Sequence, residues 1–262
     1  MAETGRYLYA VTRDLRPQAT ADVAGVGGTS VETLAHRGLT ALVSTVSLDE
    51  FGEEPLRRNL EEMAWLERTA RAHDEVVRLA AEHGATAPLR MLTICRDDRA
   101  VLDRLDEMYD DLVAALARIE GRHEWSVKLV LPPTSTTSKP PSSTAATPPP
   151  AGRAGGGAAY LRAKKAAAQL QRESQDSAAR TAQEVYDELS SLAVAGRRLR
   201  PQDPRLSGLP GTMTLNAAYL VDDACSDSFT SAVTRLAGSH PEIQVRVDGP
   251  WPPYSFIEGD PS

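Results

Sequence analysis

The sequence predicts an α+β protein with two small ferredoxin-like α/β sandwich domains, joined by a disordered linker and a long helix. Short β-favouring runs alternate with segments of helical periodicity in both halves of the 262-residue chain. Between the halves, residues 132–158 are almost entirely Pro, Ser, Thr, Ala and Gly, with too few apolar residues to form a core. We therefore expect an N-terminal domain at 1–131, a flexible linker at 132–158 and a C-terminal domain at 159–262.

The first half begins with three strands. Residues 7–12 form a short β-favouring run. Residues 30–36 and 39–46 flank Arg37-Gly38, the layout of a β-hairpin with a tight turn. The second arm alternates along its length, as a strand with one buried face does.

Two helices and two further strands complete the predicted N-terminal domain. A helix is expected from about Pro55 to His83, and a strand follows at Pro88–Cys95. A second helix opens at Asp97 or Asp98 and continues to about Glu120. The strand Trp125–Leu131 is expected to close this unit, giving a mostly antiparallel sheet with helices on one face.

The second half begins with a long helix from about 159 to 195, whose apolar stripe is narrow and weak at its N-terminal end. Such a helix is expected to pack partly on its own domain and partly on another protein. A strand at Met213–Asp222, a helix at 227–237 and a strand at 243–247 then form a βαβ unit.

The chain ends in an unusual ribbon at Gly249–Phe256. Three prolines restrict the backbone there, so the segment should be stiff and extended. It carries Trp251, Tyr254 and Phe256 in a chain that is only 5% aromatic. Rigidly presented aromatic rings serve either as binding anchors or as core plugs, and the sequence alone leaves both readings of Trp251 open.

Composition and charge narrow the classes of protein. A formal net charge of −7 disfavours general nucleic-acid binding, which needs a basic footprint. No apolar run approaches the roughly 18 residues needed to span a membrane, and no apolar signal segment follows Met1. Two distant cysteines, Cys95 and Cys225, fit a reducing compartment. The sequence therefore predicts a cytoplasmic protein that does not bind nucleic acid or membranes.

No residue pattern points to catalysis, a metal or a cofactor. The only cluster that mixes imidazole and carboxylate is His73-Asp74-Glu75, and neighbouring side chains on a helix point about 100° apart. The glycine-rich run at 152–157 lacks both the preceding strand and the Lys-Ser/Thr ending of a phosphate loop. We therefore expect a protein that is not an enzyme and holds no metal or cofactor.

Several segments together resemble one family, the gas vesicle synthesis proteins GvpL/GvpF. They are Tyr7-Leu8-Tyr9-Ala10-Val11, His73 with Val76, Pro88-Leu89-Arg90 with Thr93, Gly157-Ala158-Ala159-Tyr160-Leu161, and Gly249-Pro250-Trp251-Pro252-Pro253-Tyr254-Ser255-Phe256. The resemblance covers nearly the whole chain except the linker. One departure stands out, because members commonly carry Phe-Gly where this chain has Met91-Leu92.

The resemblance implies a non-enzymatic accessory protein of gas vesicle assembly, active during nucleation or growth and associated with the gas vesicle. Its implied partners are the small hydrophobic shell protein and other accessory proteins. The candidate contact residues are Arg90, Trp251, Tyr254 and Phe256. Two alternatives stay open: a minor structural component of the vesicle wall, and a small-molecule-binding regulatory ferredoxin-like protein.

Overall fold

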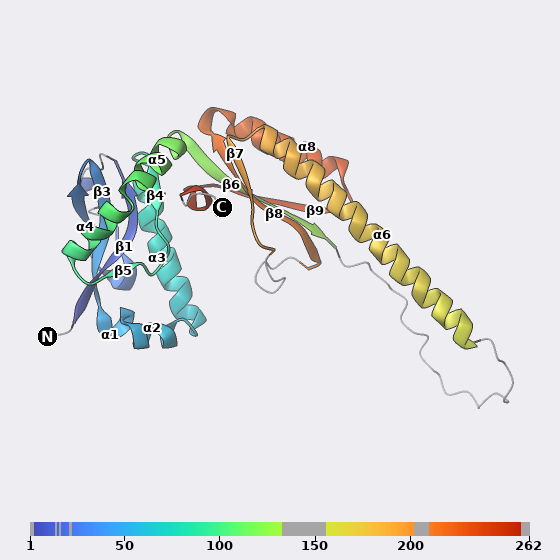
Figure 1. The fold of residues 1–262 in the computed structure, drawn as a ribbon, viewed down its shortest axis with the longest axis horizontal. Coiled ribbons are helices and arrows are strands. Elements are labelled where there is room, and N and C mark those ends of the chain that lie inside the picture. The colour runs from blue at the N-terminus through green and yellow to red at the C-terminus, as the bar shows by residue number, and fades with distance from the viewer. Residues whose placement is uncertain are drawn as a thin grey trace. The chain divides into compact units, whose positions relative to one another are not determined.

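The chain folds into two antiparallel sheets with helices packed on them, which confirms the α+β fold class (Figure 1). This computed structural model describes residues 3–13, 15, 17–20, 23–132, 156–201 and 210–257. The predicted linker lies outside these residues, apart from Pro132 and a short helical piece at its end.

Contacts divide the described residues into two compact units, each made of separate stretches of chain. The first unit contains the chain up to Trp125, the segment Tyr219–Ser226 and the residues from Gly249 onward. The second contains the described residues within Ser126–Ala218 and Asp227–Asp248. The aromatic ribbon, which sequence reasoning assigned to the C-terminal domain, is thus grouped with the first unit.

Five strands build the sheet of the first unit. They are β1 (Thr4–Thr12), β2 (Glu32–His36), β3 (Leu39–Ser47), β4 (Thr86–Pro88) and β5 (Ile94–Cys95). The order is β2-β3-β1-β4, and β5 also pairs with β1. The predicted hairpin is confirmed: Arg37 and Gly38 both have positive φ, 51° and 81°, as a tight turn matching the twist of its strands requires.

The single strand predicted at Pro88–Cys95 is wrong, because the chain leaves the sheet between β4 and β5. The Leu89 N–H donates to the Tyr9 carbonyl at 2.9 Å, and the Leu8 N–H donates to the Thr93 carbonyl at 2.9 Å. Between these two attachments the backbone makes a tight turn at Arg90–Thr93. Positive φ at Leu92, 67°, makes this turn possible and is incompatible with a continuous strand.

The helices of the first unit are shorter and more numerous than the sequence indicated. They are α1 (Leu48–Phe51), α2 (Glu53–Asn59), α3 (Met63–Ala81), α4 (Asp98–Glu107) and α5 (Tyr109–Ile119). The predicted start of this helix at Asp97 or Asp98 is confirmed: α4 begins at Asp98, and the Asp97 side chain caps it by accepting a hydrogen bond from the Ala100 N–H at 2.8 Å. The described residues of this unit also contain the short 3-10 helices η1 (Pro17–Thr20), η2 (Val26–Gly28), η3 (Asp223–Cys225) and η4 (Tyr254–Phe256).

Helices cover both faces of the first sheet, not one face as the sequence suggested. Every residue of β1 after Thr4 is buried, which requires cover on both sides. Tyr7 and Tyr9 face α3, whereas the neighbouring position Arg6 points the other way and pairs with Asp98 of α4 at 2.7 Å. Hydrophobic periodicity locates such helices but does not say which face of the sheet each one covers.

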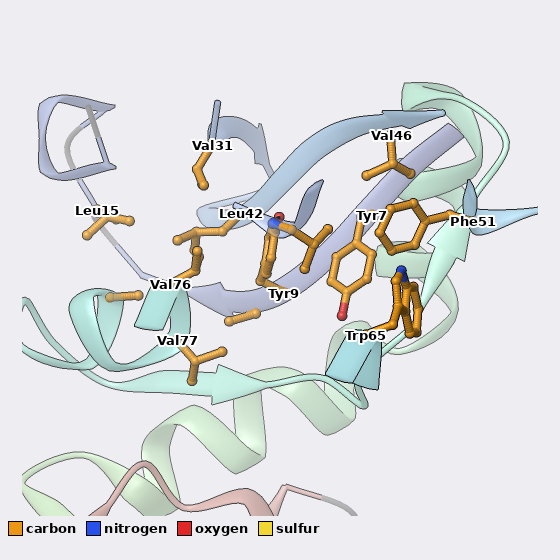
Figure 2. Packing of buried hydrophobic residues seen from close by; sticks show 13 residues of the cluster. Tyr7, Tyr9, Leu15, Val31, Leu42, Val46, Phe51, Trp65, Val76 and Val77 are labelled. Carbon is orange, nitrogen blue, oxygen red and sulfur yellow. Dashed lines mark hydrogen bonds between the residues drawn. The ribbon is translucent and has the colours of Figure 1, made fainter. Parts of the chain in front are cut away.

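The core on the α3 face is unusually aromatic for this chain (Figure 2). The Tyr7 and Tyr9 rings lie side by side with centroids 4.7 Å apart, and Phe51 is 6.0 Å from Tyr7. Phe51 in turn packs on Trp65 of α3 at 5.6 Å. Both tyrosines are fully buried, and their hydroxyls are hydrogen-bonded, so the opening Tyr-Leu-Tyr motif forms part of the core.

The second sheet contains β6 (Arg122–Leu131), β7 (Ala195–Arg198), β8 (Thr212–Asp222) and β9 (Gln244–Trp251), in the order β7-β8-β6-β9. The expectation that Trp125–Leu131 closes the N-terminal sheet is therefore wrong. A strand's residues set its faces, but its pairing partner is chosen by tertiary packing. With α6 (Gly156–Ser191) and α8 (Ser226–Ser239), the element order is β-α-β-β-α-β, the ferredoxin-like pattern.

The buried residues of the long helix α6 all lie on one face of its C-terminal half, whereas the described side chains of its N-terminal half are exposed. Ala178, Val185 and Leu189 lie in the core, and Glu188 pairs with Arg235 of α8 at 2.5 Å. In contrast, Leu170 is 67% exposed. This distribution agrees with the weak N-terminal stripe predicted from the sequence.

Candidate functional site at the C-terminal tail

The tail, defined as Gly249–Ile257, finishes β9 and then turns sharply. Gly249 has a φ of 149°, and a Cβ at this position would lie 2.8 Å from the Trp125 ring, so only glycine fits here without a shift. After Trp251 the chain continues through two buried prolines into η4. The Tyr254 N–H donates to the Pro252 carbonyl at 2.8 Å, which fixes this turn.

Glu124 of β6 holds the tail in place. Its carboxylate is largely buried and accepts two hydrogen bonds from Ser255, one from the backbone N–H at 2.8 Å and one from the hydroxyl at 2.7 Å. Charge-assisted hydrogen bonds of this kind are among the stronger ones in proteins. Phe256 adds a buried ring that is only 3% exposed. The tail is therefore an ordered segment with a fixed anchor.

The three aromatic residues of the ribbon differ in how far their side chains are exposed. Phe256 plugs the core, so its ring is not accessible to a partner and we no longer count it among the candidate contacts. Trp251 is 43% exposed and Tyr254 is 38% exposed, which is high for such large apolar side chains. Of the sequence-predicted anchors, these two rings remain at the surface.

Tyr254 also contacts two residues of α3, Asp74 and His73. Its hydroxyl donates to the Asp74 carboxylate at 3.2 Å, and its ring centroid lies 6.4 Å from that of His73. Burial and the neighbouring Asp74 charge together raise the pKa of Tyr254 above its usual value. The tyrosine is therefore neutral and acts as a hydrogen-bond donor.

His73 is a core residue and is uncharged near neutral pH. Its ring is 3% exposed, and burial lowers its pKa from 6.5 to about 4, despite opposing effects from Asp74 and the Leu89 backbone. The Leu92 N–H donates to the Tyr7 hydroxyl oxygen at 3.0 Å. The Tyr7 O–H is then free to donate to Nδ1 of His73, also at 3.0 Å. His73 thus links the helix, the sheet and the Arg90 turn.

The tail and the Arg90 turn meet at a pocket of about 210 Å³. Its described lining residues are Pro88, Leu89, Arg90, Thr93, Arg104, Met108, Tyr254 and Ile257. Two residues singled out from the sequence, Arg90 and Tyr254, therefore lie at one site, whereas Trp251 is not among the lining residues. The turn is fixed by the Thr93 hydroxyl, which donates to the Arg90 carbonyl at 2.7 Å.

Sequence reasoning missed Glu124, Arg104 and Ile257. Glu124 and Ser255 are 131 residues apart in the chain, and Arg104 lies on the polar side of an ordinary amphipathic helix. Glu124, Arg104 and Ile257 belong to none of the motifs singled out from the sequence, so only tertiary structure could identify their roles.

The part of the chain that the structure describes offers few groups for metal binding or thiol chemistry. No cluster of three or more His, Cys, Asp or Glu side chains there is placed to hold a metal ion. Both cysteines are free thiols, and burial raises the pKa of Cys95, which keeps its thiol protonated. Among the same residues, no helix combines the length and apolar character needed to cross a bilayer.

The family of the chain follows from a direct match. The family model described as "Gas vesicle synthesis protein GvpL/GvpF" matches residues 5–258. The chain belongs to the GvpL/GvpF family. GvpL/GvpF proteins are gas vesicle proteins, and the family is not a known enzyme family. Membership places this chain in gas vesicle formation, in association with other gas vesicle components.

Two relatives within the GvpL/GvpF family come from Streptomyces sp. (strain CB03234). Gas vesicle protein L of that strain is 39% identical to this chain and aligns with 96% of this chain and 92% of its own length. Gas vesicle protein F of the same strain is 28% identical, over 96% of this chain and 99% of its own length.

Solved GvpF structures have the same fold. The gas vesicle protein GvpF from Anabaena sp. PCC7120 superposes with a TM-score of 0.69 at 20% identity, covering 98% of this chain and 97% of that protein. GvpF from Microcystis aeruginosa gives 0.63 at 18% identity, covering 97% and 99%. At these identities the likeness establishes the fold.

Proposed function

We propose that this chain binds the small hydrophobic shell protein of the gas vesicle, and other accessory proteins, during vesicle nucleation or growth. The observation that carries the proposal is the anchored tail. A buried carboxylate, Glu124, and a buried ring, Phe256, hold a segment whose other two aromatic rings, Trp251 and Tyr254, are substantially exposed.

An anchored aromatic surface is well suited to capture an apolar partner. Large rings bury much apolar area, and tryptophan and tyrosine are the residues that most often dominate binding energy at interfaces. Since the tail is already ordered, little conformational entropy is lost when it binds. Non-obligate interfaces commonly place such rings at their centre and polar groups at their rim.

The proposed mechanism is transient capture without chemistry. The chain carries a net charge of −7, which keeps it dispersed, and it would hold an apolar shell subunit until the subunit joins the growing wall. An accessory protein of this kind is not built into the wall of the finished vesicle. Washing purified vesicles with urea should therefore remove any chain that is still bound, whereas a component of the wall would stay bound.

The test is capture of the shell protein upon co-expression. Wild-type chain should capture it, and Trp251→Ala should reduce capture strongly while leaving the circular dichroism spectrum unchanged. Leu170→Ala is the matched control, because it also removes an exposed large apolar side chain, from α6. This variant should capture the shell protein as well as wild type does.

Two results would contradict the proposal. Absence of capture by wild-type chain would exclude direct binding of the shell protein. Loss of capture in Leu170→Ala together with full capture by Trp251→Ala would move the contact from the tail to α6.

A further inference from the structure

The edge strand β9 offers backbone hydrogen-bonding groups that no other described strand uses. In the order β7-β8-β6-β9 it lies at one end of the second sheet, so among the described strands only β6 pairs with it. An edge strand directs the N–H and C=O groups of every second residue away from the sheet. In Gln244–Asp248, the part of β9 that belongs to the second unit, no backbone group bonds to a described residue outside the sheet. This edge is therefore open to another strand.

The edge of β9 also lacks the usual protection against pairing with another strand. Edge strands are commonly protected by prolines, bulges or charges of one sign. The segment Gln244–Asp248 contains no proline, and Val247 is 36% exposed. Its two charges, Arg246 and Asp248, have opposite signs, and the Arg246 Nε donates to both Asp248 carboxylate oxygens, at 3.1 and 3.0 Å. In contrast, the edge strand β7 is four residues long and ends in two arginines, which disfavour self-pairing.

The sequence of this segment is complementary to itself. Two identical strands that pair antiparallel about a two-fold axis match their outward-directed backbone groups only when the axis passes through a residue. With the axis at Val247, Arg246 of each copy lies opposite Asp248 of the other, and the two Val247 side chains lie opposite one another. An axis at Arg246 or at Asp248 would place two like charges opposite each other, which is destabilising. An axis at Val245 pairs no opposite charges.

We infer that the chain forms a symmetric dimer in which the β9 strands of two copies pair antiparallel about a two-fold axis at Val247. Pairing joins the four-stranded sheets of the two copies, and the assembly stops at two because each copy covers the open edge of the other. A contact along one short strand buries far less than the roughly 1,200 Å² of a standard interface, so we expect a Kd on the order of 100 µM. The dimer goes beyond the proposed function and does not depend on capture of the shell protein.

The first measurement is sedimentation velocity of the full chain at concentrations from about 5 to about 500 µM. Wild-type chain should change from monomer to dimer as the concentration rises through this range. Amide hydrogen exchange within Gln244–Asp248 should slow over the same range, because pairing protects the amides that point outward.

Two charge reversals test the register. Arg246→Asp places aspartate opposite aspartate, and Asp248→Arg places arginine opposite arginine, so each variant alone should dimerise at least about tenfold more weakly than wild type. In an equimolar mixture, a copy of one variant paired with a copy of the other has opposite charges at both positions. The mixture should therefore dimerise about as well as wild type does. Because Asp248 also lies 3.9 Å from the Lys128 ammonium, melting temperatures are measured to show that each variant is folded.

The matched control is Arg71→Asp. Arg71 is exposed on α3 and pairs with Glu67, and its reversal changes the net charge by the same amount as Arg246→Asp does. This variant should dimerise as wild type does.

A wild-type chain that stays monomeric at every concentration would overturn the inference. A dimer that Arg246→Asp leaves unchanged would overturn it too, because the contact would then lie on another surface. A mixture of the two folded variants that stays monomeric would refute the register at Val247. The sedimentation assay contains no shell protein, so these outcomes are distinct from failure of the proposed function.

Discussion

Leu92 occupies a backbone conformation that suits glycine. Its φ is 67°, in the left-handed region, which costs a residue with a Cβ about 1 kcal/mol or more relative to glycine. The resemblance described from the sequence implies glycine at this position, where this chain has Leu92. In this chain the Leu92 side chain packs against the aromatic core, and its N–H donates to Tyr7, which offsets the strain.

Two substitutions separate the backbone and packing contributions at Leu92. Leu92→Ala removes the packing and keeps the strained φ, whereas Leu92→Gly removes both. We expect the glycine variant to be more stable than the alanine variant by about 1 kcal/mol, with the greater freedom of glycine in the unfolded chain already subtracted. Urea unfolding of the two variants measures this difference. Equal stabilities, or a more stable alanine variant, would contradict the assignment of strain at this turn.

His73 makes the stability of the protein depend on pH. Its pKa is about 4 in the folded protein and 6.5 when unfolded, so the unfolded chain binds more protons between these pH values. The free energy of unfolding should therefore fall as the pH drops from about 6.5 to 4, by up to ~3 kcal/mol from this residue. Above pH 6.5 the contribution of His73 is constant.

The matched variant is His73→Gln, whose side-chain oxygen can still accept from Tyr7 but does not titrate. It should flatten the dependence of unfolding free energy on pH between 4 and 6.5 while shifting the profile little near pH 7. Urea unfolding at several pH values gives both profiles. Parallel profiles for wild type and variant would mean that other groups cause the pH dependence.

At the scale of elements, the buried Glu124 carboxylate is one of the groups that hold the tail. Ser255→Ala removes the hydroxyl donor and leaves an oxygen of Glu124 without that hydrogen bond, which should lower stability by about 1–2 kcal/mol. The amides of Tyr254 and Phe256 should exchange faster with solvent in this variant. Ser239→Ala serves as the control, since the Ser239 hydroxyl also donates a hydrogen bond, but at the exposed end of α8, and its loss should cost less than 0.5 kcal/mol. Equal effects of the two substitutions would show that the tail is not anchored through Ser255.

Local sequence patterns predicted the individual helices and strands better than they predicted which of these elements pair or pack with one another. Arg37-Gly38 specified the hairpin because two positive φ values are needed at its turn, and Asp97 marked the start of α4 through its cap. The split between β4 and β5 was missed, because nothing in the residue types of Met91-Leu92 indicates a left-handed backbone. The sheet that β6 joins was missed because strand periodicity describes faces and not neighbours.

The candidate site was only partly predictable for a similar reason. The three aromatic residues of the ribbon are equivalent in the sequence, and only the η4 turn directs Phe256 into the core while Tyr254 stays at the surface. The pairing of Glu124 with Ser255 joins segments 131 residues apart. Such contacts depend on how the whole chain folds back, which periodicity and motif spacing do not encode.

At the scale of the whole molecule, each compact unit is built from separated stretches of chain. The tail from Gly249 onward is grouped with the first unit, although it continues the strand β9, whose earlier residues belong to the second unit. The proposed binding surface therefore depends on the correct return of the chain's last residues to a unit that folds from its first ones.

The most direct test of the account is amide hydrogen exchange of the full chain, alone and in complex with co-purified shell protein. We expect slower exchange at the tail, Gly249–Ile257, and at the adjoining turn, Arg90–Thr93, when the shell protein is bound. Exchange over the exposed half of α6 should stay the same. Protection confined to α6, with no change at the tail or the turn, would contradict the central claim that the anchored tail captures the shell protein.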